Sequence, residues 1–196
     1  MVGRIATDLE PAEIVDTAIE IFTEHGLAAV SMRNVGARLG VSPVPLSRRV
    51  GNKDALLDAM ADRLLAGMAP AIDPDEEWSA YAVRWAQAVR TRLAATADMR
   101  LLVGDRRSAF VDASRPLVDA MLAAGFAADA AVQACRLLLW AVVGFAVIEQ
   151  RRPPRRAATP RARRPGGDPA GVTPTEADQL FGLHIRYLLD GIRRDR

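Results

Sequence analysis

Residues 31–51 have the sequence SMRNVGARLGVSPVPLSRRVG, and this stretch decides the fold of the N-terminal part of the chain. Ser31 can cap a short helix that ends at Gly40, a residue free to adopt positive φ. Ser42 can cap a second helix, because Pro43 and Pro45 then fall in its first turn, where backbone amides have no intrahelical acceptor to lose. The stretch therefore predicts two short helices joined by a tight turn.

Helical periodicity continues on both sides of this stretch. Before it, apolar residues recur at three- and four-residue spacing from Pro11 to about His25, and after it a helix starts at Asn52 and is expected to reach Pro70. Further helices are predicted over residues 78–93, 108–124, 128–149 and 175–192, with a mobile Pro-, Gly- and Arg-rich loop over 151–174. Residues 128–149 are apolar nearly all round and are expected to be buried on most sides. The fold class is all-α.

Composition argues against a disulfide-bonded, membrane-spanning or metal-binding protein. The 196 residues carry a net charge of +2 and a single cysteine, Cys135, which excludes an intrachain disulfide. The N-terminus lacks the apolar core of a signal peptide, and no uninterrupted apolar stretch approaches the roughly 18 residues of a membrane span. Two histidines leave little material for a metal cluster. We expect a cytoplasmic protein without membrane, metal or cofactor.

Positive charge is concentrated where the two short helices are predicted. No Asp or Glu lies between His25 and Lys53. The same window holds five cations: Arg33, Arg38, Arg48, Arg49 and Lys53. Two short helices joined by a turn form the unit whose second helix enters the DNA major groove. The pattern favours DNA binding over its alternative, a solvated basic surface on a helical hairpin.

Residues 11–65 resemble the N-terminal domain of the TetR family of transcriptional regulators. The similarity rests on an apolar first helix, the Gly-Leu-x-x-x-Ser-Met-Arg entry at 26–33, the Leu-Gly-Val-Ser-Pro turn at 39–43 and the Val-Gly-Asn-Lys-Asp-Ala-Leu-Leu segment at 50–57. More loosely, the rest of the chain is similar to the ligand domain of the tetracycline-repressor branch. The resemblance implies a dimeric repressor that binds a palindromic double-stranded DNA operator and is released by a small organic effector.

The resemblance also implies a domain organisation. Residues 1–51 form a three-helix helix-turn-helix DNA-binding domain, residues 52–70 a connecting helix, and residues 71–196 a helical effector-binding and dimerisation domain. The family dimerises through its last two long helices, here about 128–149 and 175–192. We therefore expect a homodimer.

Roles in DNA binding follow from the matched positions. The resemblance implies that Arg33 reads a base edge, that Val44 contacts a thymine methyl, and that Lys53 holds a phosphate. The full predicted set is Arg33, Ser42, Pro43, Val44, Pro45, Ser47, Arg48, Arg49 and Lys53. Relatives usually carry Tyr and His where this chain has Ser47 and Arg49. These departures leave the operator sequence unpredictable.

An effector pocket is predicted among the apolar side chains of the larger domain. The predicted contacts are Trp85, Phe110, Met121, Trp140 and Phe145, and the candidate polar groups are Arg84, Gln87, Gln133 and Glu149. Tetracycline repressors hold a magnesium-drug chelate through a histidine shortly before a Gly-Thr pair, and residues 101–105, Leu-Leu-Val-Gly-Asp, lack that histidine. An apolar or aromatic effector bound without metal is therefore favoured.

Two other classes of function remain as alternatives. The first keeps the fold but loses operator recognition, which leaves a ligand- or partner-binding helical dimer with an altered third helix. The second is an enzyme, which is disfavoured because the sequence offers no Gly-rich phosphate loop, no Cys-His pair at a plausible spacing and no metal-ligand cluster.

Overall fold

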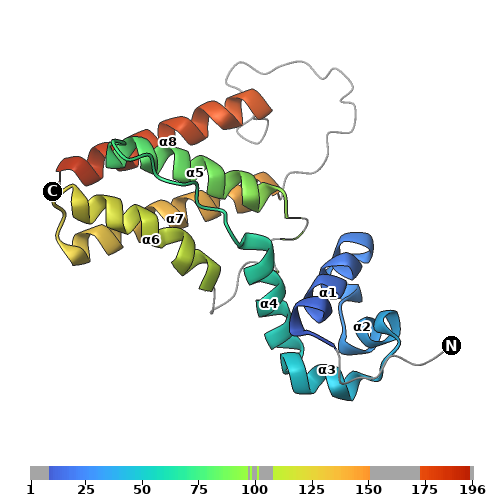
Figure 1. Cartoon of the computed structure of the whole chain (residues 1–196). Helices are drawn as coiled ribbons and strands as arrows, with labels where there is room; N and C mark the ends of the chain where they lie inside the picture. Colours follow the sequence, from blue (N-terminus) through green and yellow to red (C-terminus); the bar gives the residue numbers. More distant parts are fainter. Residues whose placement is uncertain (1–8, 97, 99–100, 102–107, 151–172, 195–196) are drawn as a thin grey trace, which may run out of the picture. The chain divides into compact units, whose positions relative to one another are not determined.

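The structure, a computed structural model, describes residues 9–96, 98, 101, 108–150 and 173–194. All regular secondary structure in these ranges is helical, which confirms the predicted all-α fold (Figure 1). The described residues divide into two compact units, and the division passes through one helix between Ala113 and Ser114. The mobile loop expected over 151–174 lies outside the described residues apart from its last two positions.

The first unit is built around α1, Pro11–His25. This helix contacts α2 (Met32–Leu39), α3 (Pro43–Val50) and α4 (Lys53–Leu65). The side chains that these four helices bury together are almost fully inaccessible to solvent; they include Ile14, Ala18, Ile21, Phe22, Val35, Leu46, Leu56, Met60 and Leu65. Because α2 and α3 are short, their positions depend on this shared core more than on intrinsic helix stability.

The predicted caps of the short helices and of α4 are present with one exception. Ser31 Oγ accepts a hydrogen bond from Asn34 N at 3.1 Å, and Asn52 Oδ1 accepts one from Ala55 N at 2.8 Å. Gly40 ends α2 in the left-handed region, with φ 72°. Ser42 occupies the N-cap position of α3, but the expected side-chain capping bond is absent. One cause is local: the third helical residue is Pro45, and proline has no N–H to donate, which leaves Val44 as the one first-turn amide that such a bond could use.

The connecting helix is shorter than predicted. The sequence pattern extends it to Pro70, whereas α4 ends at Leu65. Gly67, at φ 65°, turns the chain in a conformation that no helix continues through. The apolar residues Leu64 and Leu65 do not reveal where the helix ends, because a turn after a helix can also bury apolar residues. Met68, which follows the helix, is buried in this way.

The second unit contains α5 (Trp78–Ala94), α7 (Ala128–Gln150) and α8 (Pro174–Arg194), which pack pairwise against one another, and α6 (Ser108–Ala123) from Ser114 onward (Figure 1). The start of α8 is fixed by a reciprocal capping box. Glu176 N donates to Thr173 Oγ1, and Thr173 N donates to Glu176 Oε2, each at 3.2 Å.

Helix α7 has one buried face and one exposed face, so the prediction that it is buried on most sides is wrong for the single chain. Its buried residues are Ala131, Ala134, Cys135, Leu138, Val142 and Ala146. The opposite face exposes Leu137, Trp140 and Ile148. By length and composition this helix could cross a membrane, which the sequence analysis did not anticipate. Core helices of soluble proteins have the same length and composition.

Candidate DNA-binding surface and ligand cavity

The first candidate site is a cationic surface on α2, α3 and the start of α4. Arg33, Arg48 and Lys53 are exposed, and within the described part of the chain they form no ion pair. Three unpaired cations on one small helical unit are suited to the phosphate backbone of a nucleic acid, because each cation can displace a condensed counterion.

Arg38 belongs to the same acid-free window but has a different environment. Its Nη2 lies 2.7 Å from Glu24 Oε2 and its Nη1 lies 3.2 Å from Glu24 Oε1, while Glu20 is 4.0 Å away. The hydrogen bond with Arg38 lowers the pKa of Glu24, and the same bond raises the pKa of Arg38. Arg38 therefore ties α2 to α1, and its charge is already matched.

Helix α3 and its N-cap residue carry the remaining predicted residues. Ser42, Pro43, Ser47 and Arg49 are exposed, whereas Pro45 is half-buried. Val44 is 60% exposed, which is high for a large apolar side chain. Ser47 Oγ donates to the carbonyl of Pro43 at 3.3 Å. The structure thus brings the α3 residues together on one accessible surface; their individual roles stay predictions.

Sequence analysis did not single out Gly36, which sets the approach of α2 to the turn. It is buried, and a Cβ built on it would lie 2.7 Å from the carbonyl oxygen of Val41. Val41 N in turn donates to the carbonyl of Gly36 at 2.9 Å. The sequence does contain a signal for this close approach, which is a glycine in the middle of a predicted short helix. A helix interior disfavours glycine unless another backbone approaches closely.

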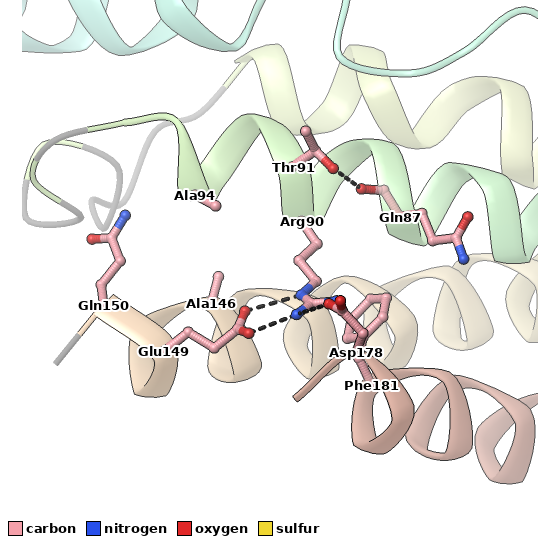
Figure 2. A pocket seen from close by; sticks show the side chains of 9 residues that line it. All are labelled: Gln87, Arg90, Thr91, Ala94, Ala146, Glu149, Gln150, Asp178 and Phe181. Carbon is pink, nitrogen blue, oxygen red and sulfur yellow. Dashed lines mark hydrogen bonds and ion pairs between the residues drawn. The ribbon is translucent and has the colours of Figure 1, made fainter. Parts of the chain in front are cut away.

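The second candidate site is a cavity of about 650 Å³ in the second unit, between α5, α7 and α8 (Figure 2). It is lined by Gln87, Arg90, Thr91, Ala94, Ala146, Glu149, Gln150, Asp178 and Phe181. Its volume falls in the range of small-molecule sites, and its wall mixes apolar side chains with amides, a hydroxyl and charged groups.

Arg90 is the centre of the polar wall of this cavity. Its Nε and Nη2 lie 2.9 and 2.6 Å from the two carboxylate oxygens of Glu149, and Nη2 lies 2.9 Å from Asp178 Oδ1. The guanidinium also lies 4.6 Å from the ring centroid of Phe181 and 5.2 Å from that of Phe145. The hydrogen bonds to Glu149 raise the pKa of Arg90. Arg90 therefore joins all three helices as a fixed cation (Figure 2).

None of the five predicted effector residues lines this cavity. Trp85 and Met121 are fully buried, Phe110 is half-buried and Trp140 is 68% exposed. Phe145 comes nearest, since its ring packs edge-on against the lining residue Phe181 at 5.2 Å. Their roles as effector contacts stay predictions. Two of the candidate polar groups, Gln87 and Glu149, do line the cavity.

Comparison with known proteins, by a family model and by individual relatives, points to a single family. Residues 14–60 match the model of the bacterial regulatory proteins of the tetR family. Over 148 residues the chain is 31% identical to the tetracycline repressor protein class A from transposon 1721 of Escherichia coli, covering 74% of this chain and 68% of that protein.

Solved structures also resemble nearly the full length of the chain, among them one with a bound ligand and one with bound DNA. A TetR variant from Acinetobacter baumannii AYE in complex with minocycline is 25% identical, with a TM-score of 0.75 over 96% of this chain and 99% of that one. BioQ with its double-stranded DNA operator is 25% identical, with a TM-score of 0.70 over 94% and 98%.

The chain belongs to the TetR family. It is a transcriptional regulator with a DNA-binding helix-turn-helix unit and a helical ligand-binding unit, as the resemblance implied. Proteins of this family are regulators rather than enzymes.

Proposed function

We propose that the protein is a homodimeric repressor that binds a palindromic operator and is released from it by a small organic effector. The observation that carries this proposal is the exposed cationic surface of Arg33, Arg48 and Lys53 on a helix-turn-helix. Neutralising phosphates supplies sequence-independent affinity, and side chains of α3 in the major groove supply selectivity. The likeness to BioQ, solved with its operator, supports this mode of docking.

Individual roles follow from the exposed groups. Arg33 reads a base edge, and the exposed Val44 side chain is suited to a thymine methyl. The Ser42 hydroxyl does not cap α3, so it is available to accept or donate at the DNA backbone. Lys53 is the first residue of α4, so that its ammonium group and the helix N-terminus can act on the same phosphate.

Dimerisation is supported by apolar side chains that the single chain leaves exposed on α7 and α8. These are Leu137, Trp140 and Ile148 on α7, and Leu180, Leu183 and Tyr187 on α8. Both helices bury their other face within the unit. Covering these side chains with a second copy removes apolar area from water at about 25 cal/mol per Å². A dimer also places two recognition helices at operator half-sites about 34 to 36 Å apart.

The effector is a small organic molecule with an apolar or aromatic body, bound in the second unit. The related Acinetobacter baumannii protein, solved in complex with minocycline, supports a small-molecule effector. The protein acts in the cytoplasm, where its operator lies, and performs no catalysis. The apolar composition of α7 serves the dimer interface rather than a membrane.

The experiment that tests operator binding is the selection of bound fragments from genomic DNA, including the promoter of the protein's own gene. We expect enriched fragments to share an inverted repeat. The double variant Arg33→Ala/Lys53→Ala should lose the enrichment, whereas Arg194→Ala, which removes an exposed cation at the end of α8, should keep it. Absence of enrichment by a folded dimer would refute operator binding and favour a ligand- or partner-binding dimer.

A further inference from the structure

The described lining of the cavity in Figure 2 has an excess of negative charge. Arg90, Glu149 and Asp178 are the charged members of its described lining. Both oxygens of Glu149 engage the guanidinium, so this carboxylate matches the charge of Arg90 by itself. Asp178 therefore adds a negative charge for which the described lining holds no second cation.

Arg90 and Asp178 also differ in how far their side chains are exposed to solvent. The side chain of Arg90 is only 16% exposed, and its guanidinium lies over the rings of Phe145 and Phe181. The side chain of Asp178 is 71% exposed and meets Arg90 through Oδ1. A ligand can therefore approach Asp178 from solvent. The Nε and Nη2 donors of Arg90, by contrast, are already engaged by Glu149 and Asp178.

We propose that this cavity binds a small organic cation, a primary amine or amidine carried on a flat apolar body. The cationic head lies against Asp178, and the hydroxyl oxygen of Thr91 provides an acceptor, because that hydroxyl donates its hydrogen to the carbonyl of Gln87. The apolar body lies along Ala146 and the ring of Phe181. An organic anion would face the charge of Asp178.

This inference deepens the proposed function, since it gives the chemical class of the effector, but binding in the cavity does not depend on operator recognition. The probes are 1-naphthylmethylammonium and two uncharged or anionic counterparts, 1-naphthylmethanol and 1-naphthoate. Their binding to the full chain is measured by calorimetry at low ionic strength. We expect the ammonium to bind several-fold more tightly than either counterpart.

The variant Asp178→Asn keeps the size of the side chain and removes its charge. We expect it to weaken binding of the ammonium by about two- to fivefold, the range of an exposed ion pair, and to leave the alcohol unaffected. Asp190→Asn removes the same charge from the same helix, roughly 18 Å away by the helical rise, and should change nothing.

Three results would overturn the inference: tighter binding of the naphthoate, no binding of the ammonium, or equal ammonium affinity of the wild type and Asp178→Asn. Failure of the proposed function gives a different pattern. In that case the ammonium binds with the expected dependence on Asp178, but no genomic fragment is enriched, or operator affinity does not respond to the ligand.

Discussion

Replacing Gly36 by alanine tests whether the close approach of α2 to the turn sets the geometry of the DNA-binding unit. The new Cβ would lie 2.7 Å from the Val41 carbonyl oxygen, inside the 3.0 Å that Cβ atoms in proteins essentially never breach. That oxygen belongs to backbone, which cannot rotate away as a side chain can. The turn between α2 and α3 must therefore shift, together with the hydrogen bond from Val41 N to the Gly36 carbonyl.

A matched control separates the overpacking cost of Gly36→Ala from the gain in helix propensity that any such change brings. Any Gly→Ala change inside a helix gains about 1 kcal/mol of helix propensity. Gly182→Ala in α8 receives this gain alone, because its Cβ would meet nothing within 4 Å. Gly36→Ala receives the same gain and loses about 1 to 3 kcal/mol to overpacking. The difference in unfolding free energy between the two variants therefore measures the overpacking cost.

Thermal unfolding of the two variants is the assay. A difference of 1 kcal/mol corresponds to about 2–4 °C in Tm for a chain of this size. Operator affinity should fall further in Gly36→Ala than its stability alone explains, because the turn carries α3. If Gly36→Ala were as stable as Gly182→Ala and bound the operator as the wild type does, the close approach would have no role in positioning α3.

The remaining predictions concern DNA affinity, oligomeric state and linkage. Arg33→Ala should cost about 1 to 3 kcal/mol and relax one operator position, whereas Lys53→Ala should weaken all sequences and reduce the salt slope by about one; equal losses on operator and random DNA would contradict the role of Arg33. Ser47→Tyr should tighten operator binding in a gel-shift titration, and a loss would show that α3 docks differently from its relatives. Trp140→Glu should give monomers in light scattering, unlike Val111→Glu, which charges a similarly exposed apolar position on α6. Operator DNA should weaken effector binding by the same factor by which the effector weakens operator binding, and unchanged ligand affinity would refute the linkage.

Sequence predicts the elements of the first unit closely because its signals are local. Ser31 and Asn52 cap helices through bonds to amides three residues away, and Gly40 supplies a left-handed turn by its own φ. The failure at Ser42 is also local, since it depends on Pro45 lacking an N–H. The capping box at Thr173 and Glu176 is an equally local signal. It is missed because the loop predicted over 151–174 includes Thr173, the first residue of the box.

Two polar lining residues, Gln87 and Glu149, are among the sequence candidates, but the assembly of the cavity could not be predicted in this way, because its groups come from positions far apart in the chain. Arg90 and Glu149 are separated by 59 residues, and each has the pattern of a solvated helix residue when it is considered alone. The sequence pattern instead favours aromatic residues as the pocket lining. Of the two tryptophans among them, Trp85 is packed into the core and Trp140 is exposed. Apolar periodicity identifies a buried face, but it does not distinguish core from cavity wall.

The position of Arg90 gives a physical route from ligand binding to the dimer interface. It lies on α5 and holds α7 through Glu149 and α8 through Asp178, the two helices whose exposed faces are proposed to meet the second copy. A cation that engages Asp178 competes with Arg90 for this carboxylate, while Glu149 keeps both of its bonds. The ligand therefore acts on the attachment of α8 and leaves that of α7 intact. A ligand can shift an equilibrium only by its difference in affinity for two states, and coupling of about 1 to 3 kcal/mol corresponds to a 5- to 150-fold change in operator affinity. Because one exposed ion pair contributes at most about 1 kcal/mol, displacement of Asp178 in both subunits of the dimer is needed to reach the middle of that range.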